Sequence, residues 1–144
     1  MAANGRSARG LFRRTIPAGN PLEGTTPIGF YCCHADMPGD YGEHWVGQVG
    51  HRGFLHKNRW YCIEELVQLN TPAERNRVLR GWVDGFLAYE KTDIRFRSVD
   101  RLHIEQLWVN VCHGGTLPSP HDQHCYMDNV VVADQYIGPM AVEQ

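Results

Sequence analysis

The sequence lacks long apolar runs and an excess of charge of either sign. No run approaches the roughly 20 residues that a helix needs to cross the hydrocarbon core of a bilayer, which excludes a membrane-spanning helix. The 14 Lys and Arg residues nearly balance the 16 Asp and Glu residues, for a net charge of -2. A nucleic-acid-binding protein usually carries a basic surface. We therefore expect neither a membrane nor a nucleic acid as a partner, and the oligomeric state stays open.

Lysine and secretion signals are also scarce. Lys57 and Lys91 are the two lysines, so arginine supplies nearly all the basic side chains. Arginine's planar fork suits carboxylate or phosphate recognition, although a codon-biased genome explains the excess as well. The first 14 residues hold four arginines and no apolar core of signal-peptide length. Localisation is therefore not predicted; the protein is secreted or periplasmic if the native gene carries a leader upstream.

Cysteine motifs are missing. The five cysteines include no C-x-x-C pair, and their density is too low for a disulfide scaffold, so we expect reduced, buried thiols. A zinc site is an alternative, because several ligand-type side chains lie within fourteen residues of each other. These are Cys112, His113, His121, His124 and Cys125. Their spacing does not fit structural zinc sites, so we expect no metal.

Helical periodicity is nearly absent, and Pro72–Val78 is the best candidate for a helix. The remainder reads as about seven or eight short strands between glycine and proline turn signals, which predicts an all-β sandwich or barrel in one domain. We expect residues 1–28 to form an N-terminal strand and a Pro/Gly-rich loop, and residues 29–144 to form the sandwich. Because the strands are few and Ser7–Arg14 is already strand-like, we expect a fragment of a larger jelly roll.

The clearest element is a hairpin around Asp84-Gly85, which lies between two apolar runs and favours a type I′ turn. Such a turn sets Trp82 opposite Leu87 and predicts that Arg80 and Tyr89 share the face of Trp82. Four other segments read as strands, and residues 16–29 and 35–52 read as loops. The strand-like segments are Tyr31–His34, Trp60–Asn70, His103–Val111 and Tyr126–Ala133.

Several of these segments resemble polysaccharide lyase family 14 and its alginate- and glucuronan-lyase-like relatives. The most specific block is Trp60–Pro72 (WYCIEELVQLNTP) followed by Val78–Gly85 (VLRGWVDG). Weaker pieces follow the family order at Tyr31–His34 (YCCH), Val109–Pro120 (VNVCHGGTLPSP) and Tyr126–Pro139 (YMDNVVVADQYIGP). The resemblance covers about Tyr31 to Pro139.

The resemblance implies a jelly-roll (concanavalin-like) antiparallel β-sandwich whose concave sheet holds an acidic polysaccharide. The implied reaction is β-elimination, in which a base removes the proton α to a uronate carboxylate and the C4–O bond breaks. The enzyme must neutralise the developing charge and must supply a base and an acid. This chemistry requires no metal or organic cofactor.

The resemblance also suggests site residues, because the family uses Ser-x-Arg on one strand and Tyr-x-Tyr on its neighbour, with a lysine on an earlier strand. Tyr31 matches the first tyrosine and is the expected base or acid, with Arg9 neutralising the carboxylate and Ser7 and His34 assisting. Cys33 stands at the second tyrosine. Matching Ser7 and Arg9 requires residues 16–29 to be an insertion, and no residue precedes Met1 to supply the earlier lysine.

Other side chains are expected to bind substrate. Arg80 and Tyr89 suit a carboxylate, while Glu64 and Gln68 suit sugar hydroxyls. His44, at the far end of the loop after His34, is a second candidate base, and aromatic platforms for sugar rings are also present. These platforms are Trp45, Trp82 and Trp108.

Two further alternatives stay open. The same sheet without its base would be a non-catalytic carbohydrate-binding module for acidic glycans. A truncated fragment would instead expose a sheet edge and tend to dimerise or aggregate.

Overall fold

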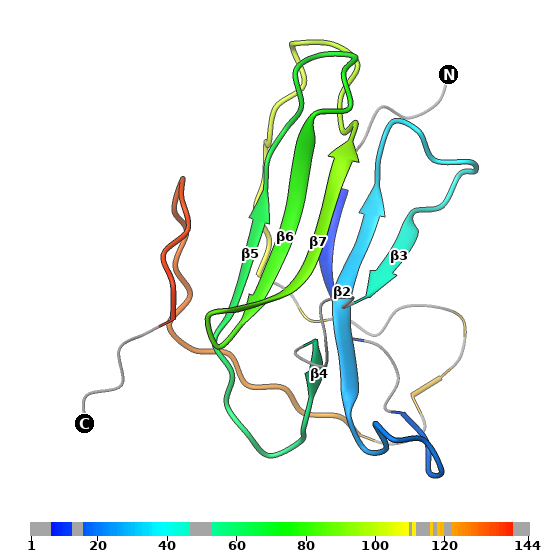
Figure 1. Cartoon of the computed structure of the whole chain (residues 1–144), viewed down its shortest axis with the longest axis vertical. Coiled ribbons are helices and arrows are strands. Elements are labelled where there is room, and N and C mark those ends of the chain that lie inside the picture. The colour runs from blue at the N-terminus through cyan, green and yellow to red at the C-terminus, as the bar shows by residue number, and fades with distance from the viewer. Residues whose placement is uncertain are drawn as a thin grey trace.

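Two antiparallel sheets form the described part of the chain (Figure 1). The computed structural model describes residues 7–12, 16–46, 53–109, 111, 116, 118–119 and 122–139, with the backbone alone at 11, 12 and 46. The seven strands within these ranges are β1 (Ser7–Phe12), β2 (Thr26–Cys33), β3 (Glu43–Val46), β4 (Phe54–Leu55), β5 (Ile63–Val67), β6 (Arg77–Val83) and β7 (Phe86–Ile94). These ranges contain no helix, and so none that could cross a membrane.

The first sheet runs β1-β2-β3, and the short β4 pairs with the start of β2. In this sheet β1 and β3 flank β2, with Arg9 on β1 and His44 on β3 both opposite Tyr31. The side chains of Phe30 and Cys32 point into the core. Because strand side chains alternate between faces, Tyr31 points away from the core, toward the outer face.

The second sheet is β5-β6-β7, and its hairpin is the one expected from the sequence. Asp84 and Gly85 both have positive φ, at 50° and 79°, as a type I′ turn requires. Asp84 also links the turn to the segment before β5. Its carboxylate accepts hydrogen bonds from the backbone N–H of Cys62 at 2.9 Å and from a guanidinium N–H of Arg59 at 2.8 Å. The pairing of Trp82 with Leu87 is confirmed.

A bulge in this hairpin overturns one expectation. The register shifts between Gly81 and Trp82, so Gly81 pairs with Tyr89 while Trp82 pairs with Leu87. The extra residue on β7 turns Tyr89 to the core face, where it is 2% exposed. The prediction that Arg80 and Tyr89 share a face with Trp82 is therefore wrong for Tyr89.

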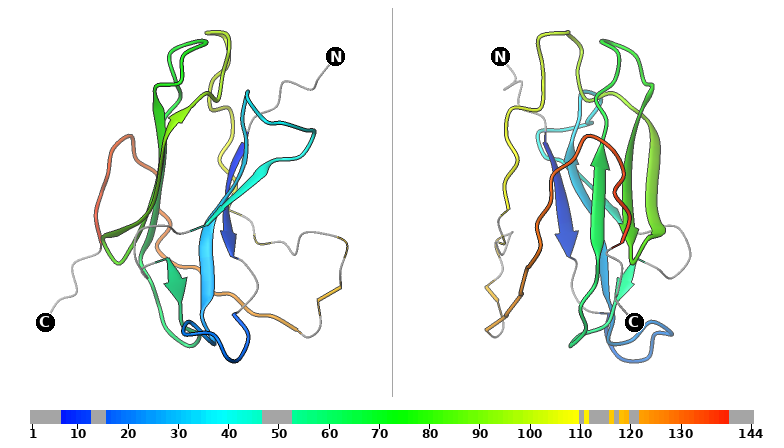
Figure 2. Two further views of the ribbon diagram at one scale, coloured as in Figure 1. Left: turned by 45° about the vertical axis from the view of Figure 1, so that its right-hand side comes forward. Right: turned by 90° about the vertical axis from the view of Figure 1, so that its left-hand side faces the viewer.

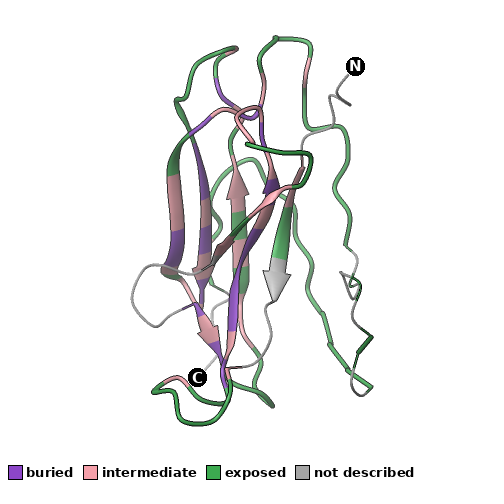
Figure 3. Ribbon diagram, turned by 90° about the vertical axis from the view of Figure 1, so that its right-hand side faces the viewer, coloured by how far each residue is buried: buried purple, intermediate pink, exposed green. Residues whose placement is uncertain are grey.

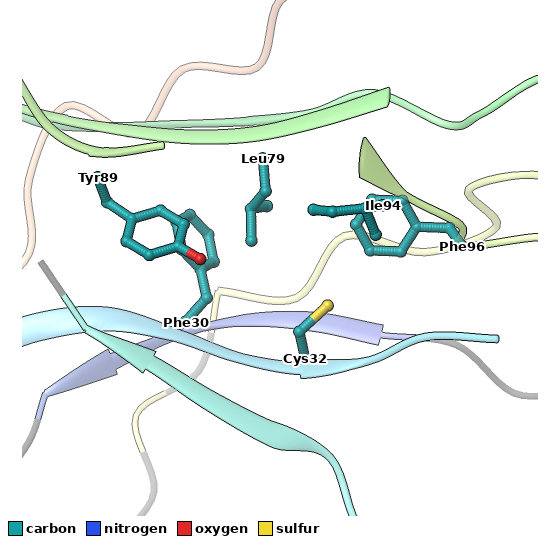
Figure 4. Close-up of a cluster of buried hydrophobic side chains, with 6 residues drawn as sticks. All are labelled: Phe30, Cys32, Leu79, Tyr89, Ile94 and Phe96. Carbon is teal, nitrogen blue, oxygen red and sulfur yellow. The ribbon is translucent and has the colours of Figure 1, made fainter. Parts of the chain in front are cut away.

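The core lies between the two sheets, whose layers Figure 2 shows edge-on. Phe30 and Cys32 reach up from β2, and Leu79 and Tyr89 reach down from β6 and β7, as Figure 4 shows. The rings of Phe30 and Tyr89 lie 5.4 Å apart. A Cβ on Gly81 would stand 3.4 Å from the Phe30 ring, which is an ordinary van der Waals distance, so β6 packs directly against this ring. Burying an aliphatic or aromatic side chain of this size contributes about 1.5–3 kcal/mol.

A second cluster, from Ile28, Leu55, Val83 and Ala88, extends the core toward β4. From β5, Val67 packs against the first cluster. The two clusters lie between the sheets and hold them face to face. This arrangement confirms the predicted all-β sandwich.

Several predicted boundaries are wrong. Pro72–Val78 is not a helix: a turn occupies 71–73, and Arg77 already begins β6. The strand expected over Trp60–Asn70 is the shorter β5, and the one expected over Tyr31–His34 is the longer β2. The loop expected over 35–52 contains β3.

The segments His103–Val111 and Tyr126–Ala133 are not strands in the part of them that the structure describes. Their apolar side chains stay exposed, as the green stretches of Figure 3 show, and Trp108 is 75% exposed. Their alternation indicates a strand, but a strand also needs a neighbour for its backbone groups. No described strand pairs with either segment.

The turn that replaces the predicted helix is built around Asn70, which is fully buried. Its amide donates to the carbonyl oxygens of Thr71, Glu74 and Arg97 at 2.7–2.9 Å, and its Oδ1 accepts the N–H of Arg97 at 2.9 Å. One side chain therefore joins the β5–β6 connection to the chain beyond β7.

Candidate active site

The outer face of the first sheet carries a row of three polar side chains from three neighbouring strands. Arg9 on β1, Tyr31 on β2 and His44 on β3 are directly opposite one another in the two registers. The Tyr31 ring is half-buried, whereas Arg9 and His44 are exposed. A guanidinium, a phenol and an imidazole are therefore presented together on one open surface.

The side chains in this row contact each other. The Arg9 Cζ lies 5.8 Å from the centroid of the Tyr31 ring, within the range of a cation–π interaction. The His44 ring meets the same ring edge-on, with centroids 4.8 Å apart and planes at 62°. Tyr31 is thus held between a cation and an imidazole.

The hydroxyl of Tyr31 is fixed by the backbone of Gly42, whose N–H donates to Tyr31 Oη at 2.8 Å. A Cβ on Gly42 would stand 2.8 Å from the carbonyl oxygen of Cys32 and 2.9 Å from the Tyr31 ring, so this position requires glycine. The hydroxyl accepts in this contact, and it keeps its own proton and a lone pair for a ligand.

Ser7 and Cys33 form the next pair along the same two strands. Each lies two residues from its neighbour in the row, so both share the outer face with Arg9 and Tyr31. Both are half-buried. The predicted grouping of Ser7, Arg9 and Tyr31 is thus present in the structure, even though residues 16–25 intervene between β1 and β2.

His34 is not brought to this row. It lies three residues beyond Tyr31, and this odd separation directs it to the core side. There it is buried; its Nε2 lies 2.5 Å from Glu43 Oε2, and its ring lies 5.2 Å from that of Trp45. The histidine that lies beside Tyr31 is therefore His44 and not His34. The signal for His44 was the alternation within β3, which is only four residues long.

The four predicted substrate-binding residues lie on the second sheet or at its end, away from the row. Arg80 pairs with Glu90 at 2.5 Å. Glu64 accepts the backbone N–H groups of Ile137 and Gly138 at 2.7 and 3.0 Å. Tyr89 is buried in the core, and Gln68 is exposed just past the end of β5.

The tryptophans are not arranged as a common platform for sugar rings. Trp45 packs against the core, with the Lys91 Nζ 5.0 Å from its ring. Trp82 stacks on Tyr136 at 4.7 Å, so the chain near the C-terminus covers it. Trp108 is exposed beyond the sheets.

Burial and charge set the protonation of several groups near the core. Burial, with further contributions from Cys33 and Glu43, raises the pKa of the Cys32 thiol to about 12, so Cys32 stays neutral. Burial also raises the pKa of Tyr89. A hydrogen bond from Arg95 lowers the pKa of Asp36, with help from Arg75.

Glu65 lies on the core face of β5. A Cβ on Gly10 of the facing sheet would stand 2.6 Å from a Glu65 carboxylate oxygen, so the acid head lies against β1, although Glu65 as a whole residue is exposed. This burial of the acid head raises the pKa of Glu65 to about 7.

The described residues contain no group of three or more histidine, cysteine, aspartate or glutamate side chains that could hold a metal ion. Cys112, His113 and His121, which belong to the alternative zinc site, lie outside the described residues. Four cysteines that the structure describes are free thiols, but only Cys32 is buried as expected, whereas two are half-buried and Cys125 is exposed. The four are Cys32, Cys33, Cys62 and Cys125.

Comparison with known proteins gives one family. A family model described as polysaccharide lyase 14 matches residues 32–130. No curated protein and no solved structure matches the chain. The matched range includes His44 and the whole second sheet, and it begins one residue after Tyr31, so Ser7 and Arg9 also lie before it.

Proposed function

This chain belongs to the polysaccharide lyase 14 family, and we propose that it cleaves a uronate-containing polysaccharide, alginate or glucuronan, by β-elimination. The observation that carries this proposal is the contact of Tyr31 with Arg9 and His44 on one exposed sheet face. The family supports a polysaccharide as the substrate. The exposed guanidinium of Arg9 in this row supports an acidic sugar.

Removing the proton on C5 of a uronate is difficult, because the proton is only weakly acidic and charge builds up on the adjacent carboxylate. Arg9 is suited to neutralise that charge with a bidentate contact. It is exposed, and no carboxylate within the described ranges lies at ion-pair distance from it. Its guanidinium is therefore available to an anionic sugar.

Tyr31 is the proposed proton-transfer residue. Gly42 orients its hydroxyl, and Arg9 beside the ring brings the substrate carboxylate near it. Holding the reacting groups in this geometry lowers the entropic part of the barrier. Ser7, two residues before Arg9 on the same face, is placed to donate a hydrogen bond to the carboxylate or to a sugar hydroxyl.

The test follows the ultraviolet absorbance of the unsaturated uronate during incubation with alginate or glucuronan. We expect steady growth with the wild-type protein and a loss of about 10²–10⁴-fold in kcat for Tyr31→Phe, which is the usual contribution of general acid–base catalysis. Substrate binding should remain. Unchanged turnover in Tyr31→Phe would exclude the assignment.

Tyr61→Phe is a closely matched control. The Tyr61 hydroxyl also accepts a backbone N–H at 2.8 Å, from His56, and its ring also lies beside an arginine, with the Arg59 Cζ at 4.6 Å. The two substitutions remove the same kind of hydrogen bond. Only the change at Tyr31 should abolish turnover.

A non-catalytic module for acidic glycans is the second candidate, and Cys33 favours it. Cys33 lies on the face of Tyr31, where the family resemblance implies a second tyrosine, and a thiol is a poor substitute for a phenol as a proton relay. Retention of the chain on alginate or glucuronan without growth of absorbance would support this function. Growth of absorbance would exclude it.

A further inference from the structure

We propose that His44 is the general base of the elimination and that Tyr31 is the acid that protonates the leaving oxygen. This assignment rests on the proposed function and divides its two proton transfers between two residues. It is carried by the cross-strand pairing of His44 with Tyr31 and by the edge-on contact of their rings at 4.8 Å.

The position of His44 suits a base that reaches an external substrate. It lies on β3, at the edge of the first sheet, and it is exposed. The titratable and charged groups on its face are Tyr31 and Cys33 on β2 and Arg9 on β1. Glu43, its neighbour in sequence, points to the opposite face and pairs with His34.

The contacts of Tyr31 suit a proton donor. Its oxygen accepts the N–H of Gly42, and phenols keep their proton at neutral pH, so the hydroxyl is ready to donate. Neutral imidazole is the side chain best suited to accept a proton in the same pH range. A phenol can thus supply the proton of one step, and an imidazole can accept the proton of the other.

The step balances without a co-reactant. His44 accepts the proton from C5, and the electron pair of the broken C–H bond forms the C4=C5 double bond. The C4–O4 bond breaks, and O4 takes the hydroxyl proton of Tyr31. Solvent water then takes the proton from the His44 imidazolium and returns one to the Tyr31 phenolate, which restores both residues. Arg9 neutralises the carboxylate charge throughout.

Two substitutions separate a chemical role for His44 from a packing role. His44→Phe keeps an aromatic ring against Tyr31 but cannot accept a proton, and His44→Ala opens space for imidazole added to the solution. His56→Ala removes another exposed histidine, away from the row, and is the control. Melting temperatures establish that each variant is folded.

We expect His44→Phe and His44→Ala to lower kcat by about 10²–10⁴-fold with little change in KM. The wild-type profile of kcat should rise from acid to neutral pH, because only an unprotonated imidazole can accept the substrate proton. That limb should disappear in both His44 variants and persist in His56→Ala and Cys33→Ser. Added imidazole should restore part of the turnover of His44→Ala.

Two results would overturn the assignment. If the wild type is active and both His44 variants keep kcat within about threefold with the same pH limb, His44 is not the base, and the proposed lyase function stands. If the wild type produces no unsaturated product from alginate or glucuronan, the proposed function and this assignment fail together.

Discussion

Replacing Asn70 by aspartate tests whether the most family-like stretch of the sequence builds the fold or performs chemistry. The two side chains have nearly the same shape, but aspartate has no N–H to donate. Asn70 is fully buried, and its amide donates to the carbonyl oxygens of Thr71, Glu74 and Arg97. Asn70→Asp would therefore point a carboxylate at three carbonyl oxygens.

The expected loss is large. Each donated hydrogen bond contributes about 0.5–1.5 kcal/mol net, and a buried charge facing acceptors adds a further penalty, so we expect about 3 kcal/mol or more. For a chain of this size that is a fall of about 6–12 °C in melting temperature. The deficit should shrink in acid, because the introduced carboxyl group regains a donor when it is protonated. Urea or thermal unfolding, compared at neutral and acid pH, measures both effects.

Asn76→Asp is the matched control in the same turn. Asn76 donates to Thr71 Oγ1 and Glu74 Oε2, but it is exposed, so we expect a loss within about 1 kcal/mol. Equal melting temperatures for the two variants would refute the argument. So would a folded Asn70→Asp protein that has lost turnover, because that result would give Asn70 a chemical role.

Two further predictions concern the site face and the core. Gly42→Ala should lower the free energy of unfolding by about 1–3 kcal/mol and reduce turnover, because the new Cβ would meet the Cys32 carbonyl and the Tyr31 ring. Gly39→Ala is the control, because Gly39 has open space around it, and it should change neither quantity. Equal melting curves and rates for the two variants would refute this. Glu65→Gln tests the raised pKa of Glu65: folding favours the protonated acid, whose stabilisation is complete below pH 4.5 and is lost as the pH rises through about 7. The glutamine variant should therefore gain stability over the wild type above about pH 7 and match it in acid, and a pH-independent difference in unfolding free energy would contradict the assignment.

Local signals predicted the parts of the fold that local geometry determines. Asp84 and Gly85 specify a tight turn by their backbone preferences, so the hairpin and the Trp82–Leu87 pair follow from the sequence. The bulge opposite Gly81 does not, because it depends on how β6 and β7 pack against the other sheet. Tyr89 consequently moved from the expected surface to the core.

Non-local pairing explains the other failures. The residues 103–111 alternate like a strand, but alternation does not supply a partner, and no described strand pairs with them. The reverse holds for β3, which has only four residues between glycines and is too short for its alternation to stand out from the glycine-rich segment around it. Its pairing with β2, which could not be read from its own sequence, makes it a strand.

The family resemblance predicted part of the candidate site, and the rest depends on which face of its strand each residue occupies. Arg9 and Tyr31 match the family's Ser-x-Arg and Tyr-x-Tyr patterns, and the structure pairs them across β1 and β2. His34 and His44 lie at the two ends of one loop in the sequence, and both are candidate bases on that evidence. The structure places His44 beside Tyr31, because residues paired across two strands lie on the same face of the sheet. His34 lies three residues from Tyr31 along the chain, and an odd separation puts it on the opposite face.

The polar side chains of the two sheets differ in whether they form hydrogen bonds to the protein's own backbone. In the family-like block, Glu64 binds two backbone N–H groups, Asn70 binds four backbone groups and Asp84 caps the hairpin, so these side chains have little capacity left for a substrate. On the first sheet, Arg9 and His44 are exposed, and both contact the ring of Tyr31. Neither side chain forms a hydrogen bond to the backbone among the described residues. Side chains that the fold does not use for its own backbone remain available for chemistry. A register slip of one residue between β2 and β3 would turn His44 to the core and break the row, so the scaffold must fix the register before the site can exist.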